Sequence, residues 1–175
     1  MENLYILFVK TNKESRVIEQ LRRDFGNSSL VPFIPMVEKV FKSSKCLIKE
    51  KKAMFPGYVF VESKMASEEF RDSVSVFIRN SSDVVRILTY GESDEIAVRD
   101  IEHQALMGLL NEDGYIEMSS GIVEGSRFRI TNGPFIGQES IVKRTDRHRM
   151  EAVVEMEMLG QNQRVTIGME IIVKC

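Results

Sequence analysis

The hydrophobic positions at the start of the chain follow two periods. Residues 4–9 (Leu-Tyr-Ile-Leu-Phe-Val) are apolar at nearly every position, which predicts a central β-strand buried on both faces. From Val17 to Phe25, apolar residues recur about every four positions, which predicts an amphipathic helix. We expect Asn12 to cap the start of this helix and Gly26 to end it.

The next stretch has the pattern of strands. Two β-rich runs, 34–41 and 46–49, flank a polar turn at 42–45, which predicts a hairpin. Residues 55–62 then form another apolar run, beginning with a Pro-Gly kink. This run predicts a further strand of the same domain.

Two more helical patterns follow. We expect Ser67 to cap a second helix, followed by a strand at 84–88. A third helix is expected from 98 to about 110, burying Ile101, Ala105, Leu106 and Leu109. This order of elements predicts an α+β sandwich over residues 1–110, in which helices flank one antiparallel sheet.

The helical pattern disappears after residue 110. Residues 111–122 are acidic and rich in small side chains, so we expect a flexible linker there. Residues 123–175 then contain five short strand-like runs separated by turns, and one of these turns is expected at Gly168. This pattern predicts a small five-stranded β-barrel. The runs are 127–130, 140–143, 152–156, 164–167 and 171–173.

Composition narrows the class of protein. The chain has 175 residues, of which 43% are apolar and 29% charged, as in soluble globular proteins. Cys46 and Cys175 match no metal-binding spacing and are too few for a disulfide framework, which favours a reducing, cytoplasmic setting. The apolar runs are too short for a membrane helix, and the first residues lack the features of a signal peptide. We therefore expect a cytoplasmic protein with no membrane partner.

The sequence offers little for catalysis. His103 and His148 are the only histidines, and neither has a nucleophile in motif context. The chain contains no nucleophile elbow, phosphate loop or dinucleotide fingerprint, and its carboxylates are scattered. We therefore predict no enzyme activity, no catalytic residues, no metal site and no cofactor.

Charge is distributed unevenly along the chain. The net charge of −2 speaks against a free-standing nucleic-acid binder, yet residues 42–52 hold five lysines against one glutamate. Residues 125–149 hold six basic residues against two acidic ones. Both clusters are either solvated surface charge or weak, salt-dependent contacts to phosphates. The candidate RNA-binding residues of the second cluster are Lys143, Arg144, Arg147, His148 and Arg149.

Aromatic residues crowd the strand that follows the Pro-Gly kink. Phe55, Tyr58 and Phe60 lie within six residues of one another. They are either core residues or an exposed apolar depression that binds a partner protein.

Two motifs resemble a known family. Residues 53–61 (Ala-Met-Phe-Pro-Gly-Tyr-Val-Phe-Val) resemble the signature of the NusG N-terminal (NGN) domain, and residues 124–135 resemble the start of its KOW barrel. The resemblance implies an NGN domain at 1–110, a linker at 111–122 and a KOW β-barrel at 123–175.

The resemblance also implies a function. Proteins of this family bind transcribing RNA polymerase at the β′ clamp helices and suppress pausing. By motif, Phe55 and Tyr58 match the aromatic residues of the polymerase-binding depression. The resemblance also implies that Tyr5 of the first strand belongs to this depression.

Departures from the family pattern suggest a specialised member. The turn at 158–161 reads Met-Leu-Gly-Gln where general NusG proteins carry Ile-Phe-Gly-Arg and contact Rho and the ribosome. The chain thus resembles the LoaP group of operon-specific antitermination factors. This interpretation predicts a monomer. Its basic residues at 143–149 would contact a nascent RNA hairpin, and Lys42, Lys45 and Lys49 would contact DNA near the polymerase cleft. The alternative is a general elongation factor whose KOW domain recruits protein partners, Rho or the ribosome, rather than RNA.

Overall fold

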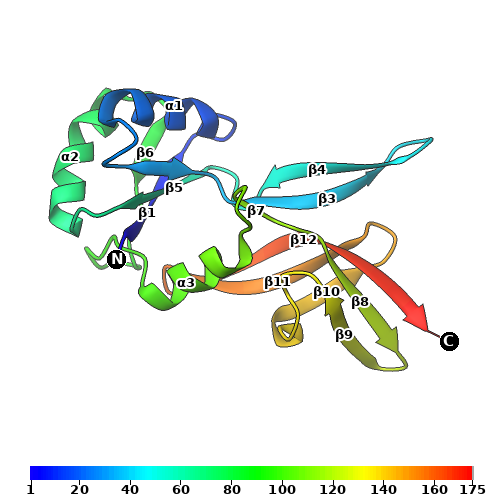
Figure 1. Cartoon of the computed structure of the whole chain (residues 1–175). Helices are drawn as coiled ribbons and strands as arrows, with labels where there is room; N and C mark the ends of the chain where they lie inside the picture. The colour runs from blue at the N-terminus through cyan, green and yellow to red at the C-terminus, as the bar shows by residue number, and fades with distance from the viewer. Residues whose placement is uncertain (175) are drawn as a thin grey trace. The chain divides into compact units, whose positions relative to one another are not determined.

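The computed structural model describes residues 1–174, and its backbone contacts divide the chain into two units (Figure 1). The first unit contains residues 1–34, 55–105 and 158–161. The second contains residues 35–54, 106–157 and those from 162 onward. The hairpin expected near residue 42 therefore belongs to the second unit rather than to the unit of the first strand. The boundaries expected at residues 110 and 122 are not those of the two units.

One four-stranded antiparallel sheet forms the centre of the first unit. Its strand order is β2 (Val31–Phe33), β5 (Tyr58–Ser63), β1 (Asn3–Val9) and β6 (Val84–Ile87). The expectation of a central first strand is confirmed, because β1 pairs with β5 on one side and with β6 on the other. The mixed α+β class expected from the sequence is confirmed as well.

Helices α1 (Glu14–Phe25) and α2 (Ser67–Asn80) pack on one face of this sheet (Figure 1). Their apolar stripes supply Val17, Leu21, Phe70 and Val74 to the core, all of which are fully buried. Burying a side chain of this size stabilises a fold by about 1.5–3 kcal/mol. The sheet contributes Tyr5, Leu7, Val9, Val59 and Val61 to the same core.

The helix ends differ from the sequence expectation at their first residues. Asn12 does not cap α1: it adopts a left-handed conformation (φ 66°), and Lys13 occupies the N-cap position without a side-chain hydrogen bond. Ser67 is the first residue of α2, after Ala66 at the N-cap. Gly26 does end α1, and its amide donates to the carbonyl oxygen of Arg22. Neither helix start is therefore held by a side-chain cap.

Helix α3 (Asp100–Leu109) forms where the sequence predicts it, but two positions expected to be buried, Ile101 and Ala105, are exposed. Ile101 is 78% exposed, whereas Glu102 is only 4% exposed. Leu106 and Leu109 are buried as expected. The reason lies in polar contacts of the Glu102 carboxylate, which are described with the site below.

The hairpin of the second unit consists of β3 (Met36–Lys42) and β4 (Leu47–Ala53). Its existence and its turn confirm the sequence prediction. The two-residue strand β7 (Tyr115–Ile116) pairs in parallel with β3. Part of the segment expected to be a flexible linker is therefore held by backbone pairing.

A five-stranded sheet makes up the rest of the second unit. Its order is β10 (Val142–Asp146), β11 (Glu151–Met158), β12 (Gln161–Lys174), β8 (Ser119–Glu124) and β9 (Arg127–Asn132), with a 3-10 turn at Glu139–Ile141 before β10. Two of the five expected strands, 164–167 and 171–173, are one continuous strand, and β8 lies mostly within the expected linker. The turn expected at Gly168 is wrong. A Cβ at this position would overlap the backbone oxygen of Glu38, so glycine is needed there for close packing.

Closure of this sheet into a barrel is not seen. Within residues 1–174, β9 and β10 are the two edges of the sheet, and no ladder joins them. The second unit is thus a β-sheet domain with the strand content of the expected barrel, and a KOW barrel stays a prediction.

Candidate functional site

Aromatic rings gather on the face of the first sheet that lies opposite α1 and α2. Strand register sets this face, because residues paired across neighbouring strands point to the same side. Phe8 pairs with Tyr58, and both Ile6 and Phe33 pair with Phe60. Phe55 precedes β5 and stacks on Phe60, with ring centroids 5.7 Å apart. We call Phe8, Phe33, Phe55, Tyr58 and Phe60 the aromatic face.

The rings of the aromatic face form contacting pairs with accessible surface. The centroids of Phe8 and Tyr58 are 5.5 Å apart, and those of Phe33 and Phe60 are 5.8 Å apart. Phe60 is buried beneath the others, whereas Phe8, Phe33, Phe55 and Tyr58 are half-buried. Stacked and tilted rings at these separations support one another by about 0.5–1.5 kcal/mol per pair. The face is therefore a rigid apolar surface.

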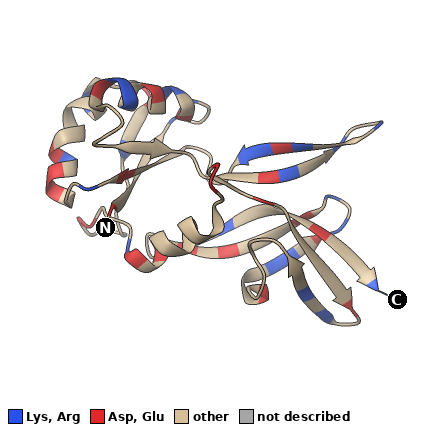
Figure 2. Cartoon of the chain, viewed as in Figure 1, with Lys and Arg blue, Asp and Glu red and all other residues tan. Residues whose placement is uncertain are grey.

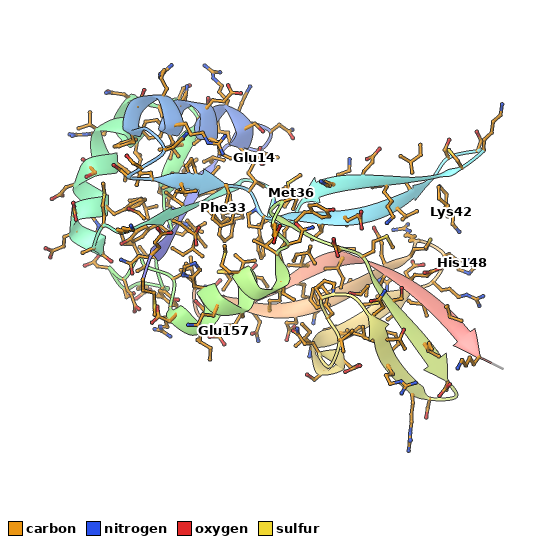
Figure 3. All side chains as sticks on the ribbon, viewed as in Figure 1. Glu14, Phe33, Met36, Lys42, His148 and Glu157 are labelled. Atoms are coloured by element: carbon orange, nitrogen blue, oxygen red, sulfur yellow. The ribbon has the colours of Figure 1, made fainter. Side chains whose placement is uncertain are left out.

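The turn at Pro56-Gly57 fixes the spacing between Phe55 and Tyr58. Gly57 has a φ of 86°, which side-chain-bearing residues rarely adopt. Its amide donates to the Glu14 carboxylate at 2.7 Å, and its carbonyl accepts from the Val9 amide at 2.8 Å. Glu14, which is 9% exposed, thus positions the turn from helix α1 (Figure 3).

Tyr5 lies elsewhere. It belongs to the helix-covered side of β1, is fully buried, and stacks on Phe70 of α2 with centroids 3.8 Å apart. Its hydroxyl donates to the carbonyl of Met65 at 2.6 Å, and burial raises the pKa of the Tyr5 hydroxyl. A side chain fully buried in the core cannot contact a partner, so Tyr5 is not part of the aromatic face. Phe8, which the sequence reasoning did not single out, takes its place.

Two side chains of helix α3, His103 and Glu102, make polar contacts within the first unit. His103 Nε2 lies 3.1 Å from the carboxylate of Glu62 on β5. The buried Glu102 carboxylate accepts from the Tyr90 hydroxyl and from the amides of Leu159 and Gly160, at 3.2 and 2.9 Å. Burial and the hydrogen bond to Glu102 raise the pKa of Tyr90. This buried carboxylate was not identified from the sequence, because nothing in the local pattern distinguishes Glu102 from a surface glutamate.

The second unit carries the basic turn, which we define as Lys143, Arg144, Arg147, His148 and Arg149. All five lie on β10 or in the turn that joins it to β11, and all are exposed. Asp146 closes the turn by accepting from the Arg149 amide at 3.0 Å, and this hydrogen bond lowers the pKa of the Asp146 carboxyl. The structure thus brings the five predicted residues together on one strand and the turn that follows it.

The hairpin lysines form a second basic region (Figure 2). Lys42 and Lys45 are exposed at the tip, whereas Lys49 lies 3.7 Å from the carboxylate of Glu38. Lys51 covers the ring of Tyr115, with its Nζ 3.8 Å from the centroid. The three lysines predicted to contact DNA therefore differ in their partners: within residues 1–174, Lys49 is in an ion pair, whereas Lys42 and Lys45 are not.

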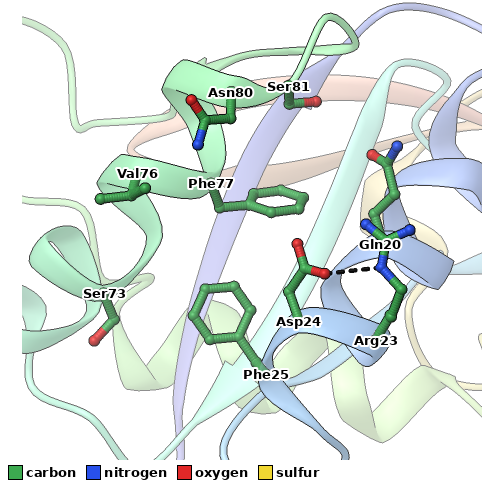
Figure 4. A pocket seen from close by; sticks show the side chains of 9 residues that line it. All are labelled: Gln20, Arg23, Asp24, Phe25, Ser73, Val76, Phe77, Asn80 and Ser81. Atoms are coloured by element: carbon green, nitrogen blue, oxygen red, sulfur yellow. Dashed lines mark hydrogen bonds and ion pairs between the residues drawn. The ribbon is translucent and has the colours of Figure 1, made fainter.

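Other parts of the described chain offer little for chemistry. A pocket of about 290 Å³ lies between the ends of α1 and α2, and its lining is mixed, with an Arg23–Asp24 ion pair at 2.9 Å on its wall (Figure 4). Among residues 1–174, no group of three or more His, Cys, Asp or Glu side chains could hold a metal ion. No helix in the described part of the chain is long and apolar enough to cross a membrane. Cys46 is exposed, and Cys175 lies outside the described residues.

Comparison with known proteins agrees with this architecture. Residues 2–107 match a family model described as "Transcription termination factor nusG". The protein "Transcription termination/antitermination protein NusG" of Borreliella burgdorferi is 25% identical over 143 residues, which cover 79% of this chain and 77% of that protein. Its namesake from Buchnera aphidicola subsp. Acyrthosiphon pisum is 25% identical over 173 residues, covering 93% of this chain and 91% of that protein. The chain therefore belongs to the NusG family of transcription termination and antitermination factors.

Proposed function

We propose that this protein binds transcribing RNA polymerase through the aromatic face and promotes processive elongation at specific operons, with no catalytic step. The observation that carries the proposal is the set of four half-buried rings on the side of the sheet opposite α1 and α2. Rigid aromatic rings supply much of the binding energy in protein interfaces. The names of the two relatives, which are termination/antitermination proteins, support the same process.

The proposed partner surface on the polymerase is the pair of clamp helices of the β′ subunit. An amphipathic helix buries its apolar face in a hydrophobic groove, and an aromatic floor suits this mode of recognition. Phe55 and Tyr58 flank the Pro56-Gly57 turn that Glu14 holds in place. Their geometry is thus fixed before binding, which reduces the entropic cost of association.

The test is capture of core polymerase by the Phe55→Ala/Tyr58→Ala double variant. Truncating an interface hot spot costs about 2 kcal/mol or more. We therefore expect the affinity for core polymerase to fall by a factor of about 30 or more. Phe41→Ala is the matched control, because Phe41 is an exposed aromatic residue (39%) on the hairpin and outside the aromatic face. Undiminished capture by the double variant, in a chain with an unchanged circular dichroism spectrum, would contradict the proposal.

We further propose that the basic turn contacts a nascent RNA hairpin. Its support is the exposure of the five side chains, which lie on strand β10 and in the turn that follows it. The alternative is recruitment of Rho or the ribosome through the turn at 158–161. That alternative has less support, because Leu159 is 8% exposed and its amide is bonded to Glu102.

The two interpretations predict different partners for the whole protein. RNA contact predicts that a leader RNA hairpin is bound in a salt-dependent way and that Arg144→Ala/Arg147→Ala weakens it. Protein recruitment predicts that Rho or ribosomes are captured and that the same double variant has no effect. If the affinity for RNA changes neither with salt concentration nor in the double variant, the basic turn is not the RNA-binding site.

A further inference from the structure

The two basic clusters are far apart in the sequence but belong to the same unit. Lys39 of β3 lies 3.5 Å from the Glu151 carboxylate, at the first residue of β11. The neighbouring Glu38 accepts from the Met118 amide at 3.1 Å, and its backbone lies against Gly168 of β12. The hairpin is therefore attached to the five-stranded sheet at the position where the basic turn ends.

Both clusters extend from this attachment. Lys42 follows Lys39 by three residues, which is about 10 Å along a strand. The last residue of the basic turn, Arg149, is two positions before Glu151. Figure 3 shows Lys42 and His148 at the same end of the unit, in agreement with the Lys39–Glu151 contact.

The strand register places one arginine on the side of the hairpin. Arg144 pairs with Val153, and Asp146 pairs with Glu151. Residues paired across strands share a face, as do residues two apart along a strand. Arg144 therefore lies on the same face of the sheet as Glu151, whose carboxylate contacts Lys39 of β3.

Ion pairs divide the cations of these clusters into two groups. Lys39, Lys49, Lys52 and Lys143 each lie within 4 Å of a glutamate. Of the cations at the hairpin tip and in the basic turn, four take part in no ion pair within residues 1–174: Lys42, Lys45, Arg144 and Arg147. Lys51, farther along the hairpin, covers the ring of Tyr115 instead. Arg149 has only a long contact to Asp146, at 3.9 Å. The unpaired charges are at the hairpin tip and the basic turn, where a polyanion can reach them.

We infer that the hairpin tip and the basic turn form one continuous surface that binds the phosphate backbone of a single RNA stem. The inference rests on the proposed RNA contact and adds Lys42 and Lys45 to it, in place of a separate DNA contact. All four unpaired cations are on strands or turns, so no helix inserts them into a groove to read base edges. Recognition of A-form RNA by shape and phosphate contacts fits such an arrangement.

The experiment measures binding of the full chain to a 20-nucleotide RNA stem-loop by fluorescence anisotropy at several salt concentrations. The variants are Lys42→Ala/Lys45→Ala at the hairpin and Arg144→Ala/Arg147→Ala at the basic turn. Lys13→Ala/Lys64→Ala is the matched control, since both lysines are exposed in the first unit. A DNA duplex with the same number of base pairs is the second probe.

We expect each test variant to weaken RNA binding about tenfold or more at 0.1 M salt, and to lower the slope of log affinity against log salt by about one for each phosphate that the variant no longer neutralises. The control should match the wild type. If only the basic-turn variant binds RNA more weakly, the continuous surface is wrong while the proposed RNA contact stands. If the hairpin variant affects only the DNA duplex, the surface is likewise wrong. If the wild type shows no salt-dependent RNA binding, both proposals fail.

Discussion

Replacing Glu102 by alanine tests how the structure uses a buried carboxylate. The change removes the acceptor of three donors: the Tyr90 hydroxyl and the amides of Leu159 and Gly160. A buried donor left without a partner costs about 1–3 kcal/mol. Gly160 is exposed and its amide can bind water, so the cost comes mainly from Tyr90 and Leu159, which are 7% and 8% exposed. We expect a decrease of about 3 kcal/mol in the free energy of unfolding, within the range of these two penalties.

Two measurements check this value. Urea unfolding followed by circular dichroism should show a lower midpoint for Glu102→Ala, and hydrogen exchange should show about a hundredfold weaker protection of the Leu159 amide. Glu102→Gln keeps one acceptor oxygen and should be destabilised roughly half as much. Ile101→Ala is the matched control, because its side chain is 78% exposed; its effect should stay within about 0.5 kcal/mol. If Glu102→Ala is no less stable than Ile101→Ala, the inferred role of the carboxylate is wrong.

Three other predictions concern separate residues. Gly168→Ala should cost about 2 kcal/mol or more in urea unfolding, because its Cβ meets Glu38, whereas Gly108→Ala, with open space around it, should be neutral or stabilising. Glu14→Ala should cost about 1–3 kcal/mol in the same assay by leaving the Gly57 amide unpaired, and an unaltered midpoint would contradict that role. The folded chain holds the pKa of Asp146 below its ordinary value of 3.8; its carboxylate therefore stabilises the fold above that pH, and the benefit disappears as pH falls through the lowered pKa. The difference in the free energy of unfolding between wild type and Asp146→Asn should thus decrease as the pH is lowered. A difference that does not change with pH would refute this.

The sequence was sufficient for most elements of the first unit, because their patterns are local. An apolar run of six residues and a four-residue spacing determine β1 and α1, and the glycine at position 26 marks a helix end. The starts of the helices were less predictable. Asn12 and Ser67 have the chemistry of caps, but the N-cap positions of the two helices are occupied by Lys13 and Ala66.

The face on which an aromatic residue lies depends on strand register, which no local pattern determines. Tyr5 and Phe8 belong to the same strand and differ by three positions, so they point to opposite faces. Only the pairing of Phe8 with Tyr58 shows which of the two belongs to the aromatic face. A slip of one residue would have exchanged them.

Long-range contacts explain the remaining differences. Gly168 has the character of a turn residue in the sequence, but the backbone of Glu38, 130 positions earlier in the chain, is what requires a glycine there. Similarly, Glu102 turns inward because donors from Tyr90 and Leu159 meet it. The basic turn, in contrast, was predictable from sequence, since its five residues are consecutive or nearly so.

The most direct test of the central claim is site-specific photocrosslinking in a reconstituted elongation complex. A photoreactive benzoylphenylalanine replaces Tyr58 of the aromatic face in one protein and the exposed Ile101 of α3 in the other. Docking through the aromatic face predicts a crosslink from position 58 to the β′ clamp helices and none to those helices from position 101. A polymerase-bound protein that crosslinks from position 101 and not from position 58 would contradict it.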